Sequence, residues 1–219
     1  MAAKLFGAAF DDPDWLFEIK WDGFRVEAVV DRGAVALWTR GRQDAARYFG
    51  TFLEPPTWLK ATRAIVDGEV IALDAHGEPD FALLQDAIRK RGMTAGAQLT
   101  YEVFDLLYLD GRSLLDVPLE DRKAALAAIL VPHPRVRLSE HVVGDGVVFF
   151  EEARLRGLEG IVAKDRHSVY QPGKRPDRWR KIKNRPEQEL VVGGWAPGVG
   201  AAAELGALLV GIHENGRLR

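Results

Sequence analysis

The eight residues 18–25 constrain the fold of this chain more than any other stretch. They read Glu-Ile-Lys-Trp-Asp-Gly-Phe-Arg and follow the apolar residues 15–17 without a break. Residues 15–20 therefore predict a half-buried strand, and the Asp-Gly pair at positions 22 and 23 indicates a turn directly after it. Because an ammonium group at the end of a half-buried strand is costly unless it is used, we expect Lys20 to have a chemical role.

This stretch combines a reactive amine with an anion-binding group. Burial and neighbouring cations lower the pKa of an ammonium group, so Lys20 is a candidate nucleophile near neutral pH. Gly23 allows the backbone to turn tightly, and the planar fork of Arg25 suits a phosphate. The alternative is an edge hairpin with a solvated lysine, because short motifs often match by chance.

Five motifs together resemble those of the covalent nucleotidyltransferases, the superfamily of ATP-dependent DNA ligases, RNA ligases and mRNA capping enzymes. The first, Lys-x-Asp-Gly-x-Arg at residues 20–25, resembles the nucleotidyl-lysine motif. The others follow in the family's order: Asp-Gly-Glu at 67–69, Phe-Asp at 104–105, Glu-Gly-Ile-Val-Ala-Lys at 159–164 and Trp-Arg-Lys-Ile-Lys at 179–183. Residues 103–112 are closer to the ligase domain of bacterial end-joining ligases than to capping enzymes.

A further segment partly matches the ligases. A hairpin predicted over residues 26–38 is followed by Thr-Arg-Gly-Arg at positions 39–42. Ligases usually have Ser/Thr-Arg-Asn-Gly here, with an arginine that reaches the nucleotide, and Arg40 matches it. Gly41 and Arg42 depart from Asn-Gly, so the role of Arg42 is open. A solvated arginine at a strand end is the alternative for both arginines.

The resemblance implies a role for each matching residue. Lys20 and Lys181 are the implied catalytic residues, the first as nucleophile and the second against charge on the departing pyrophosphate. Glu69 and Glu159 are the implied ligands of Mg²⁺ or Mn²⁺, and Glu69 also of the ribose. The implied residues of the ATP site are Glu18, Ile19, Lys20, Arg25, Arg40, Glu69, Phe104, Lys164, Lys181 and Lys183.

The residue types in these motifs suit those roles. The carboxylates of Asp67 and Glu69 interrupt an apolar strand, where each needs a cation, a hydroxyl or a turn. An aromatic ring such as Phe104 offers a purine a flat apolar face, although a strand phenylalanine alone is usually a core residue. Lys181 and Lys183 share one face of a strand because side chains alternate. A structural bulge remains the alternative at residues 67–69.

The fold class implied is α+β: a nucleotidyltransferase domain of antiparallel sheets with flanking helices over residues 1–185. Helices are predicted at 44–53, from a cap at Asp80 to about 91, at 118–130 and at 145–157, and strands at 64–73, 99–109 and 136–143. Pro186 marks a boundary. Residues 189–195 and 207–213 predict two strands of an OB-type barrel, which needs about five to close, so 186–219 reads as an incomplete OB fragment.

Composition excludes several other classes of protein. The chain has 219 residues, no cysteine and a net charge of −2, so it offers no thiolate metal site and no overall attraction to nucleic acid. Residues 174–185 gather seven Lys/Arg against one Asp, which is a local patch for phosphates. No apolar run approaches the length of a membrane span, and residues 1–10 do not resemble a signal peptide. We expect a protein of the bacterial cytosol or nucleoid.

The function implied by the resemblance is an ATP-dependent DNA ligase that acts on nicked double-stranded DNA in repair or end joining. Its relatives are joined to polymerase and nuclease domains or recruited by a Ku-like end-binding protein, so these are possible partners. Three alternatives remain open. They are an RNA ligase or capping-type enzyme, a non-catalytic nucleotide- or DNA-binding remnant, and an unrelated binding module with a basic patch.

Overall fold

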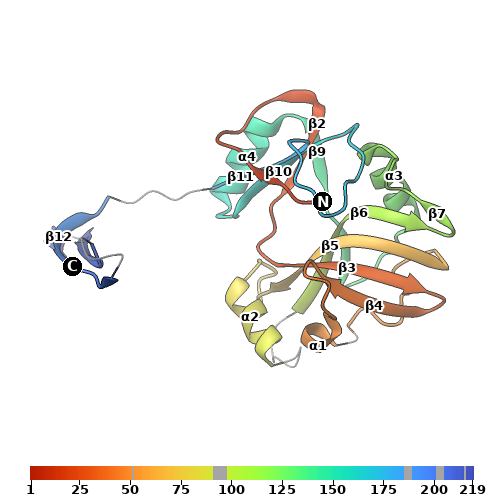
Figure 1. Ribbon diagram of the computed structural model, residues 1–219, viewed down its shortest axis with the longest axis horizontal. Coiled ribbons are helices and arrows are strands. Elements are labelled where there is room, and N and C mark those ends of the chain that lie inside the picture. Colours follow the sequence, from red (N-terminus) through yellow and green to blue (C-terminus); the bar gives the residue numbers. More distant parts are fainter. Residues whose placement is uncertain (51, 91–97, 185–188, 201–204, 215) are drawn as a thin grey trace. The chain divides into compact units, whose positions relative to one another are not determined.

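A computed structural model describes residues 1–50, 52–90, 98–184, 189–200, 205–214 and 216–219 (Figure 1). By its internal contacts the chain divides into two units, Met1–Asn184 and Arg185–Arg219, and each is described here by itself. The boundary predicted at Arg185 and Pro186 lies outside the described residues. Within the described ranges, no helix is long and apolar enough to cross a membrane.

The first sheet of the larger unit carries the strand that leads to Lys20. Its order is β1-β11-β10-β2-β9, all neighbours being antiparallel except β1 and β11. Helix α4 (Gly146–Leu155) packs against β2 and β10, and buried Phe17, Ile161 and Ile182 form the core beneath it. The strands are β1 (Lys4–Leu5), β2 (Asp12–Ile19), β9 (His141–Gly144), β10 (Gly160–Asp165) and β11 (Trp179–Lys183).

The second sheet carries the Asp-Gly-Glu and Phe-Asp motifs. Its order is β4-β3-β5-β6-β7, and β8 adds to β6 in parallel. Helices α1 (Ala46–Phe49), α2 (Phe81–Arg89) and α3 (Leu119–Ile129) contact β4, β5 and β6, respectively. The strands are β3 (Phe24–Asp31), β4 (Ala34–Thr39), β5 (Arg63–Leu73), β6 (Gln98–Leu109), β7 (Arg112–Ser113) and β8 (Val136–Leu138).

Local sequence signals placed several elements correctly. The predicted hairpin is β3 and β4, and its turn takes positive φ at Arg32 (49°) and Gly33 (91°). Asp80 caps α2 by accepting a hydrogen bond from the Leu83 backbone N–H at 3.0 Å. Helix α4 ends before Gly157, whose φ of 68° suits a residue without a Cβ. The α+β class with largely antiparallel sheets is confirmed.

Two predicted elements were wrong in extent. The strand predicted at residues 136–143 is two strands, β8 and β9, one in each sheet. The chain leaves the second sheet at Ser139, whose backbone N–H still donates to the Val103 carbonyl at 2.7 Å. The helix predicted at 44–53 is only the four residues of α1, because the left-handed Gly50 follows it. Strand β1 was not predicted.

Register shifts in β6 decide where the Phe-Asp motif points. Asp67 pairs with Asp105 and Gly68 with Val103, so Phe104 is an extra residue opposite this step of β5. Such a bulge redirects a side chain relative to strict alternation. Val103 accordingly joins the core of the second sheet, while Phe104 packs with Leu16 and Trp179 of the first sheet. The alternative of a structural bulge near residues 67–69 is therefore also present, on the partner strand.

The smaller unit contains two short antiparallel pairs. β12 (Val191–Ala196) pairs with β13 (Ala207–Gly211), and β14 (His213–Glu214) pairs with β15 (Arg217–Leu218). Asn215, between β14 and β15, lies outside the described residues. Trp195 and Leu209 are 63% and 70% exposed. The pairs fit a fragment of an OB-type barrel, not a closed one.

Candidate active site

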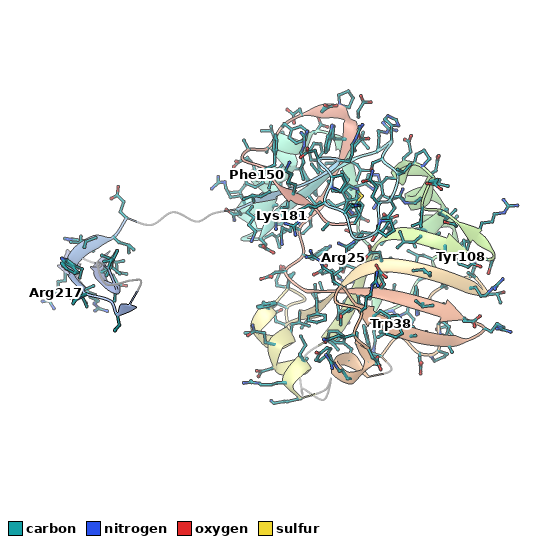
Figure 2. The ribbon with its side chains drawn as sticks, viewed as in Figure 1. Arg25, Trp38, Tyr108, Phe150, Lys181 and Arg217 are labelled. Atoms are coloured by element: carbon teal, nitrogen blue, oxygen red, sulfur yellow. The ribbon has the colours of Figure 1, made fainter. Side chains whose placement is uncertain are left out.

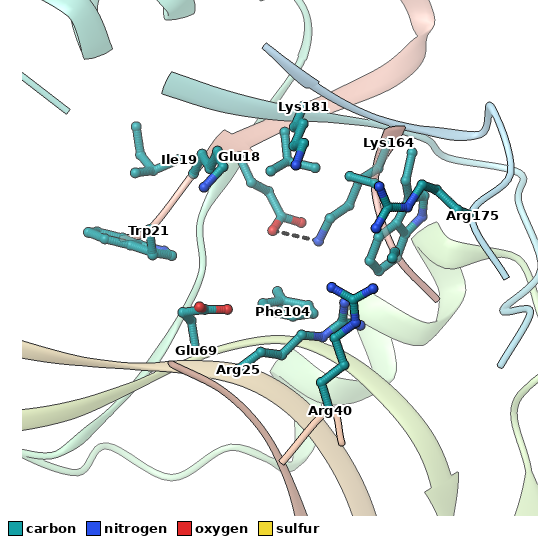
Figure 3. A pocket seen from close by; sticks show the side chains of 15 residues that line it. Glu18, Ile19, Trp21, Arg25, Arg40, Glu69, Phe104, Lys164, Arg175 and Lys181 are labelled. Carbon is teal, nitrogen blue, oxygen red and sulfur yellow. Dashed lines mark hydrogen bonds and ion pairs between the residues drawn. The ribbon is translucent and has the colours of Figure 1, made fainter. Parts of the chain in front are cut away.

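A pocket between the two sheets of the larger unit gathers the predicted site. Every residue expected at the ATP site lines it except Lys183. Figure 2 labels Lys181 on one sheet and Arg25 on the other, and Figure 3 shows Trp21 at one end of the pocket and Arg40 and Arg175 at the other. The complete lining is Ala2, Ala3, Glu18, Ile19, Lys20, Trp21, Arg25, Arg40, Glu69, Phe104, Val162, Lys164, Arg175, Trp179 and Lys181.

Lys20 lies directly after β2 and is anchored by its backbone. Its N–H donates to the Gly160 carbonyl at 2.9 Å, which ties the lysine to the start of β10. Its ammonium group forms an ion pair with Glu159, and Lys183 donates to the other oxygen of the same carboxylate at 2.9 Å. Burial alone would raise the pKa of Glu159, but the hydrogen bonds from both lysines hold that pKa below its ordinary value.

This pairing differs from the environment that we expected for Lys20. Burial among cations favours a neutral amine, whereas an ion pair with a carboxylate favours the charged ammonium. Lys181, which lines the same pocket, does meet the expectation. Burial lowers its pKa, and the neighbouring charges of Lys183 and Lys20 lower it further. In this structure Lys20 is therefore paired with a carboxylate, beside a second lysine whose pKa is lowered.

Glu69 lies on β5 and lines the pocket without an ion pair or side-chain hydrogen bond among the described residues. Burial raises its pKa to about 8, against the opposing effect of Arg25 and Lys20. Gly23 approaches this point of β5 so closely that a Cβ atom there would lie 2.5 Å from the Val70 carbonyl oxygen and 2.7 Å from Cγ of Glu69. Gly23 is thus required for close approach, and not for the tight turn that we predicted.

Arg25 is held by a carboxylate and a phenol. Its Nε and Nη2 atoms donate to Asp67 at 2.9 and 2.5 Å, and Tyr170 donates to Asp67 at 2.9 Å. Asp67 is fully buried, yet its pKa lies below the ordinary value because Arg25 and Tyr170 stabilise the carboxylate against the cost of burial. The side of the fork that we expected to bind a phosphate is thus engaged by the protein.

Glu18 lies at the centre of a buried charge cluster. Its two carboxylate oxygens accept from Lys123 and Lys164, each at 2.8 Å, and Ser139 donates to it at 3.3 Å. Glu18, Lys123 and Lys164 are all at most 3% exposed. Because both oxygens already accept from buried ammonium groups, a further hydrogen bond to Glu18, such as one from an adenine amino group, would need a remaining lone pair.

Phe104 lies in the pocket wall and is 8% exposed. The Lys164 ammonium lies 4.3 Å from the centroid of its ring and 4.4 Å from that of Trp179. The Arg25 guanidinium lies 5.4 Å from the Phe104 centroid. The predicted adenine platform therefore already contacts two cations, and the predicted phosphate ligand Lys164 is held between aromatic rings and Glu18.

Arg40 and Arg42 follow β4 and are exposed. Arg40 lines the pocket, while Arg42 lines a neighbouring cavity that it shares with Arg25, Arg40 and Lys174. Arg42 has a φ of 58°, which is unfavourable for a residue with a Cβ. The glycine that ligases usually have at this position suits that backbone conformation, so the arginine stands there at a conformational cost.

The carboxylates of Glu69 and Glu159 suit a hard divalent cation whose other ligands come from the bound substrate. No group of three metal-ligating side chains gathers within the described ranges. Glu69 and Glu159 are near enough that the negative charge of Glu159 raises the pKa of Glu69. Mg²⁺ is commonly held by one or two carboxylates together with phosphate oxygens and water, so two glutamates suffice. The metal role of Glu69 and Glu159 stays a prediction.

Sequence reasoning missed much of what positions these residues. Lys123 falls on a helix whose spacing predicted only apolar packing, and Tyr170 follows no motif. Trp179 was noted only as an aromatic residue within a basic segment. The signal that was available is spacing: Lys123 lies four residues after Leu119 and three before Leu126, so it falls on the apolar face of the helix, where a charge needs a partner inside the protein. The cation and the hydroxyl predicted for Asp67 are Arg25 and Tyr170. The missed residues are Trp21, Lys123, Ser139, Tyr170, Arg175 and Trp179.

Comparisons with known proteins show the family of this chain. A family model described as an ATP-dependent DNA ligase domain matches residues 3–183. The multifunctional non-homologous end joining DNA repair protein LigD of Mycobacterium tuberculosis is 37% identical over 206 residues, which are 94% of this chain and 26% of that protein. A DNA ligase of Thermococcus fumicolans is 33% identical over 213 residues, covering 92% of this chain and 38% of that protein.

A solved structure agrees as well. A mycobacterial DNA ligase D complexed with ATP and MES superposes with a TM-score of 0.71 at 34% identity, covering 99% of this chain and 68% of that one. The chain spans about a quarter of the length of the mycobacterial LigD protein. The similarity therefore concerns one domain of a larger relative.

Proposed function

Because the chain belongs to the family of ATP-dependent DNA ligase domains, we propose that it seals nicks in double-stranded DNA through a lysyl-AMP intermediate on Lys20. One observation carries this proposal. Residues from five separate motifs meet in a single pocket, with Lys20 and Lys181 in its lining. A role in DNA repair or end joining agrees with the names of the relatives.

In the first step Lys20 must leave its ion pair with Glu159 and lose a proton. Its Nζ atom then attacks the α-phosphorus of ATP. A phosphorus–nitrogen bond forms, the bond from the α-phosphorus to the bridging oxygen breaks, and pyrophosphate leaves. Lys181 lines the same pocket, and its positive charge would stabilise the negative charge that develops as pyrophosphate departs.

In the second and third steps the AMP group moves from Lys20 to the 5′-phosphate at a nick, and the 3′-hydroxyl then displaces AMP to close the strand. Phosphate oxygens are present at each step, so cations must stay close to them. Arg40, Arg175 and Lys181 line the pocket, and each is without an ion pair among the described residues. These side chains are the ones that remain available for phosphate.

A Mg²⁺ or Mn²⁺ ion held by Glu69, Glu159 and phosphate oxygens would neutralise charge on the triphosphate. Burial raises the pKa of Glu69 to about 8, and Glu159 is paired with Lys20 and Lys183. To hold such an ion, Glu159 would have to release both lysines.

The biological setting that we propose is a bacterial cytosol or nucleoid, with nicked DNA as substrate. A Ku-like end-binding protein and separate polymerase or nuclease domains are the proposed partners, since a relative is named as a multifunctional end-joining protein. Binding to DNA would use local patches, because the whole chain has a net charge of −2.

The test is the intact mass of the purified protein before and after incubation with ATP and Mg²⁺. We expect the added mass of one AMP, its loss in Lys20→Ala and its retention in Lys60→Ala, an exposed lysine outside the pocket. Sealing of a pre-adenylated nick separates loss of the first step from loss of the whole activity. GTP and nicked RNA are the controls for a capping enzyme or an RNA ligase.

One result would overturn the proposal. If neither an AMP adduct nor sealing of a pre-adenylated nick occurs, while AMP or DNA still binds, the chain is a binding remnant and not an enzyme. An adduct that persists in Lys20→Ala would instead move the nucleophile to another residue.

A further inference from the structure

A second cavity lies beside the candidate active site and has no part in the proposed reaction. Its volume is about 640 Å³, compared with about 230 Å³ for the first pocket. Ile19 and Trp21 line both cavities and form the wall between them. The indole N–H of Trp21 donates to the Ser139 hydroxyl at 3.3 Å, which holds this wall. A volume of this size is typical of a small-molecule site.

Glu102 on β6 contributes a buried carboxyl to this second cavity. The residue is 2% exposed, and its Oε1 atom is buried without a hydrogen-bond partner. It pairs across the sheet with Glu69, so the two carboxylates stand on neighbouring strands, one at each cavity. Burial raises the pKa of Glu102 to about 7 although Arg137 opposes the shift. An unsatisfied buried acceptor is costly unless a ligand completes it.

The rest of the wall offers flat rings and charged side chains of both signs, the acidic ones being Glu140 and Glu152. Trp21 provides an indole, and Phe149 provides a phenyl ring from α4. Arg156, the residue directly after α4, lines the cavity together with Phe149. Arg137 and Arg156 are exposed at the cavity, and neither makes a salt bridge with another described residue.

These features favour one class of ligand. A metal ion is not supported, because no group of three ligating side chains occurs in the described part of the chain. An anion alone would leave Glu102 unsatisfied. A planar ring with an amino group suits all of these side chains. The ring stacks on an aromatic side chain, its amino group donates an N–H to Glu102, and an attached phosphate would lie near the arginines.

We propose that this second cavity binds a nucleobase with an exocyclic amino group, such as cytosine or adenine. Glu102 accepts from the amino group, and Trp21 or Phe149 stacks against the ring. The base comes either from a free nucleoside or from an unpaired nucleotide of a DNA substrate. This site does not depend on the ligase chemistry, because Glu102 is not part of the first pocket.

The experiment titrates the intact protein with cytidine and with uridine and follows the indole N–H resonance of Trp21 by NMR, assigned with Trp21→Phe. Uridine has a carbonyl where cytidine has the amino group. A second arm uses a hairpin duplex with one unpaired deoxycytidine or one unpaired thymidine. We expect cytidine or the deoxycytidine hairpin to bind at least about tenfold more tightly than its partner probe.

Substitutions then locate the effect. Glu102→Leu should weaken cytidine binding at least about tenfold, and Glu102→Gln, which keeps a carbonyl acceptor, should stay within about threefold of the wild type. Thr100→Val is the matched control, since Thr100 Oγ1 is also buried and without a partner on β6 but does not line the cavity.

The results distinguish a nucleoside site from a site for a base in DNA. Glu102-dependent binding of cytidine supports a nucleoside site, and Glu102-dependent binding of the hairpin alone supports a DNA base. Equal binding of the amino and carbonyl probes, unchanged binding in Glu102→Leu, or no binding of either probe would overturn the proposal.

Discussion

Lys20 and Lys183 donate to the two oxygens of one carboxylate, that of Glu159. The first lysine follows β2, the second ends β11, and both flank the start of β10. The predicted nucleophile is thus tied to a predicted metal ligand. This single carboxylate connects the charge state of the amine with the arrival of a cation.

The pairing predicts the reactivity of Lys20 toward a small amine-directed reagent. Glu159→Gln removes the ion pair that holds the Lys20 side chain, so labelling of Lys20 should rise about fivefold, for a partly exposed pair worth about 1 kcal/mol. Peptide mass mapping after brief treatment with trinitrobenzenesulfonate measures it. Glu151→Gln, which breaks the exposed pair with Arg154 on α4, should leave Lys20 labelling unchanged. Equal labelling in both variants would contradict the pairing.

The carboxyl of Glu69 predicts a pH dependence of stability. Its pKa is raised to about 8 from an ordinary 4.5, so the folded protein keeps a proton that the unfolded chain releases. This group therefore lowers stability as pH rises from 4.5 through about 8. Glu69→Gln cannot ionise, so its melting temperature should equal that of the wild type in acid and exceed it by a few degrees, about 3 °C or more, above this window.

Thermal melts across this range test the slope. Glu102 also lowers stability as pH rises to about 7. Because Glu102 is present in both the wild type and Glu69→Gln, its effect cancels when the two proteins are compared. Glu159→Gln should show the opposite behaviour, because the pKa of Glu159 is lowered and its ionised form stabilises the fold. That variant should be less stable at neutral pH and approach the wild type as pH falls below 4.5. Parallel curves for Glu69→Gln and the wild type would refute the effect.

The buried cluster around Glu18 predicts a large cost when one cation is removed. Lys123→Met leaves the Glu18 carboxylate with Lys164 and Ser139 only, and it should lower the free energy of unfolding by about 3 kcal/mol. Adding Glu18→Gln should not recover that loss, because it leaves the buried ammonium group of Lys164 without its carboxylate partner. Urea denaturation measures both. Lys4→Met, which breaks an exposed pair with Asp177, is the control and should leave the midpoint unchanged.

Sequence patterns predicted the elements that depend on local signals. The strand leading to Lys20, the hairpin with its turn at Arg32 and Gly33, and the cap at Asp80 follow from periodicity, turn residues and capping. The five motifs then brought the predicted residues into one pocket. These features are local in sequence, so a single chain contains the information for them.

The partners of the site residues were not predictable in the same way. Lys123 is 105 residues from Glu18, and Tyr170 is 103 residues from Asp67. Such pairs depend on how the two sheets face each other, which periodicity does not report. The direction of the Phe104 side chain depends on a register shift between β5 and β6. The spacing of apolar residues in the sequence does not reveal such a bulge. The ion pair of Lys20 with Glu159 follows from the same packing.

The close approach at Gly23 predicts a sharp response to a single methyl group. In Gly23→Ala the new Cβ would lie 2.5 Å from the Val70 carbonyl, which is backbone and cannot move aside cheaply. We expect a loss of about 2 kcal/mol in stability and displacement of Glu69, seen as weaker AMP adduct formation. Gly7→Ala is the matched control because a Cβ atom at Gly7 would have no other atom within 4 Å. An unchanged Gly23→Ala protein would refute the packing argument.

Replacing Arg42 by glycine should have two opposed effects, one on stability and one on DNA binding. Its φ of 58° is unfavourable for a residue with a Cβ, so Arg42→Gly should raise the free energy of unfolding by up to about 1 kcal/mol. The same change removes a cation from the cavity lined by Arg25, Arg40 and Lys174. Affinity for a nicked duplex should therefore fall. The slope of the logarithm of the association constant against the logarithm of salt concentration should become shallower by the amount expected for about one phosphate contact.

The hairpin supplies a matched control for both effects. Arg32 has a φ of 49° in the turn between β3 and β4, and it lines none of the described cavities. Arg32→Gly should change stability in the same direction as Arg42→Gly while leaving DNA affinity and its salt dependence as in the wild type. Arg42 would then be retained against its own backbone strain because it binds phosphate. If both variants gain stability and neither loses DNA affinity, Arg42 is a tolerated surface residue and its departure from the usual glycine has no role in binding.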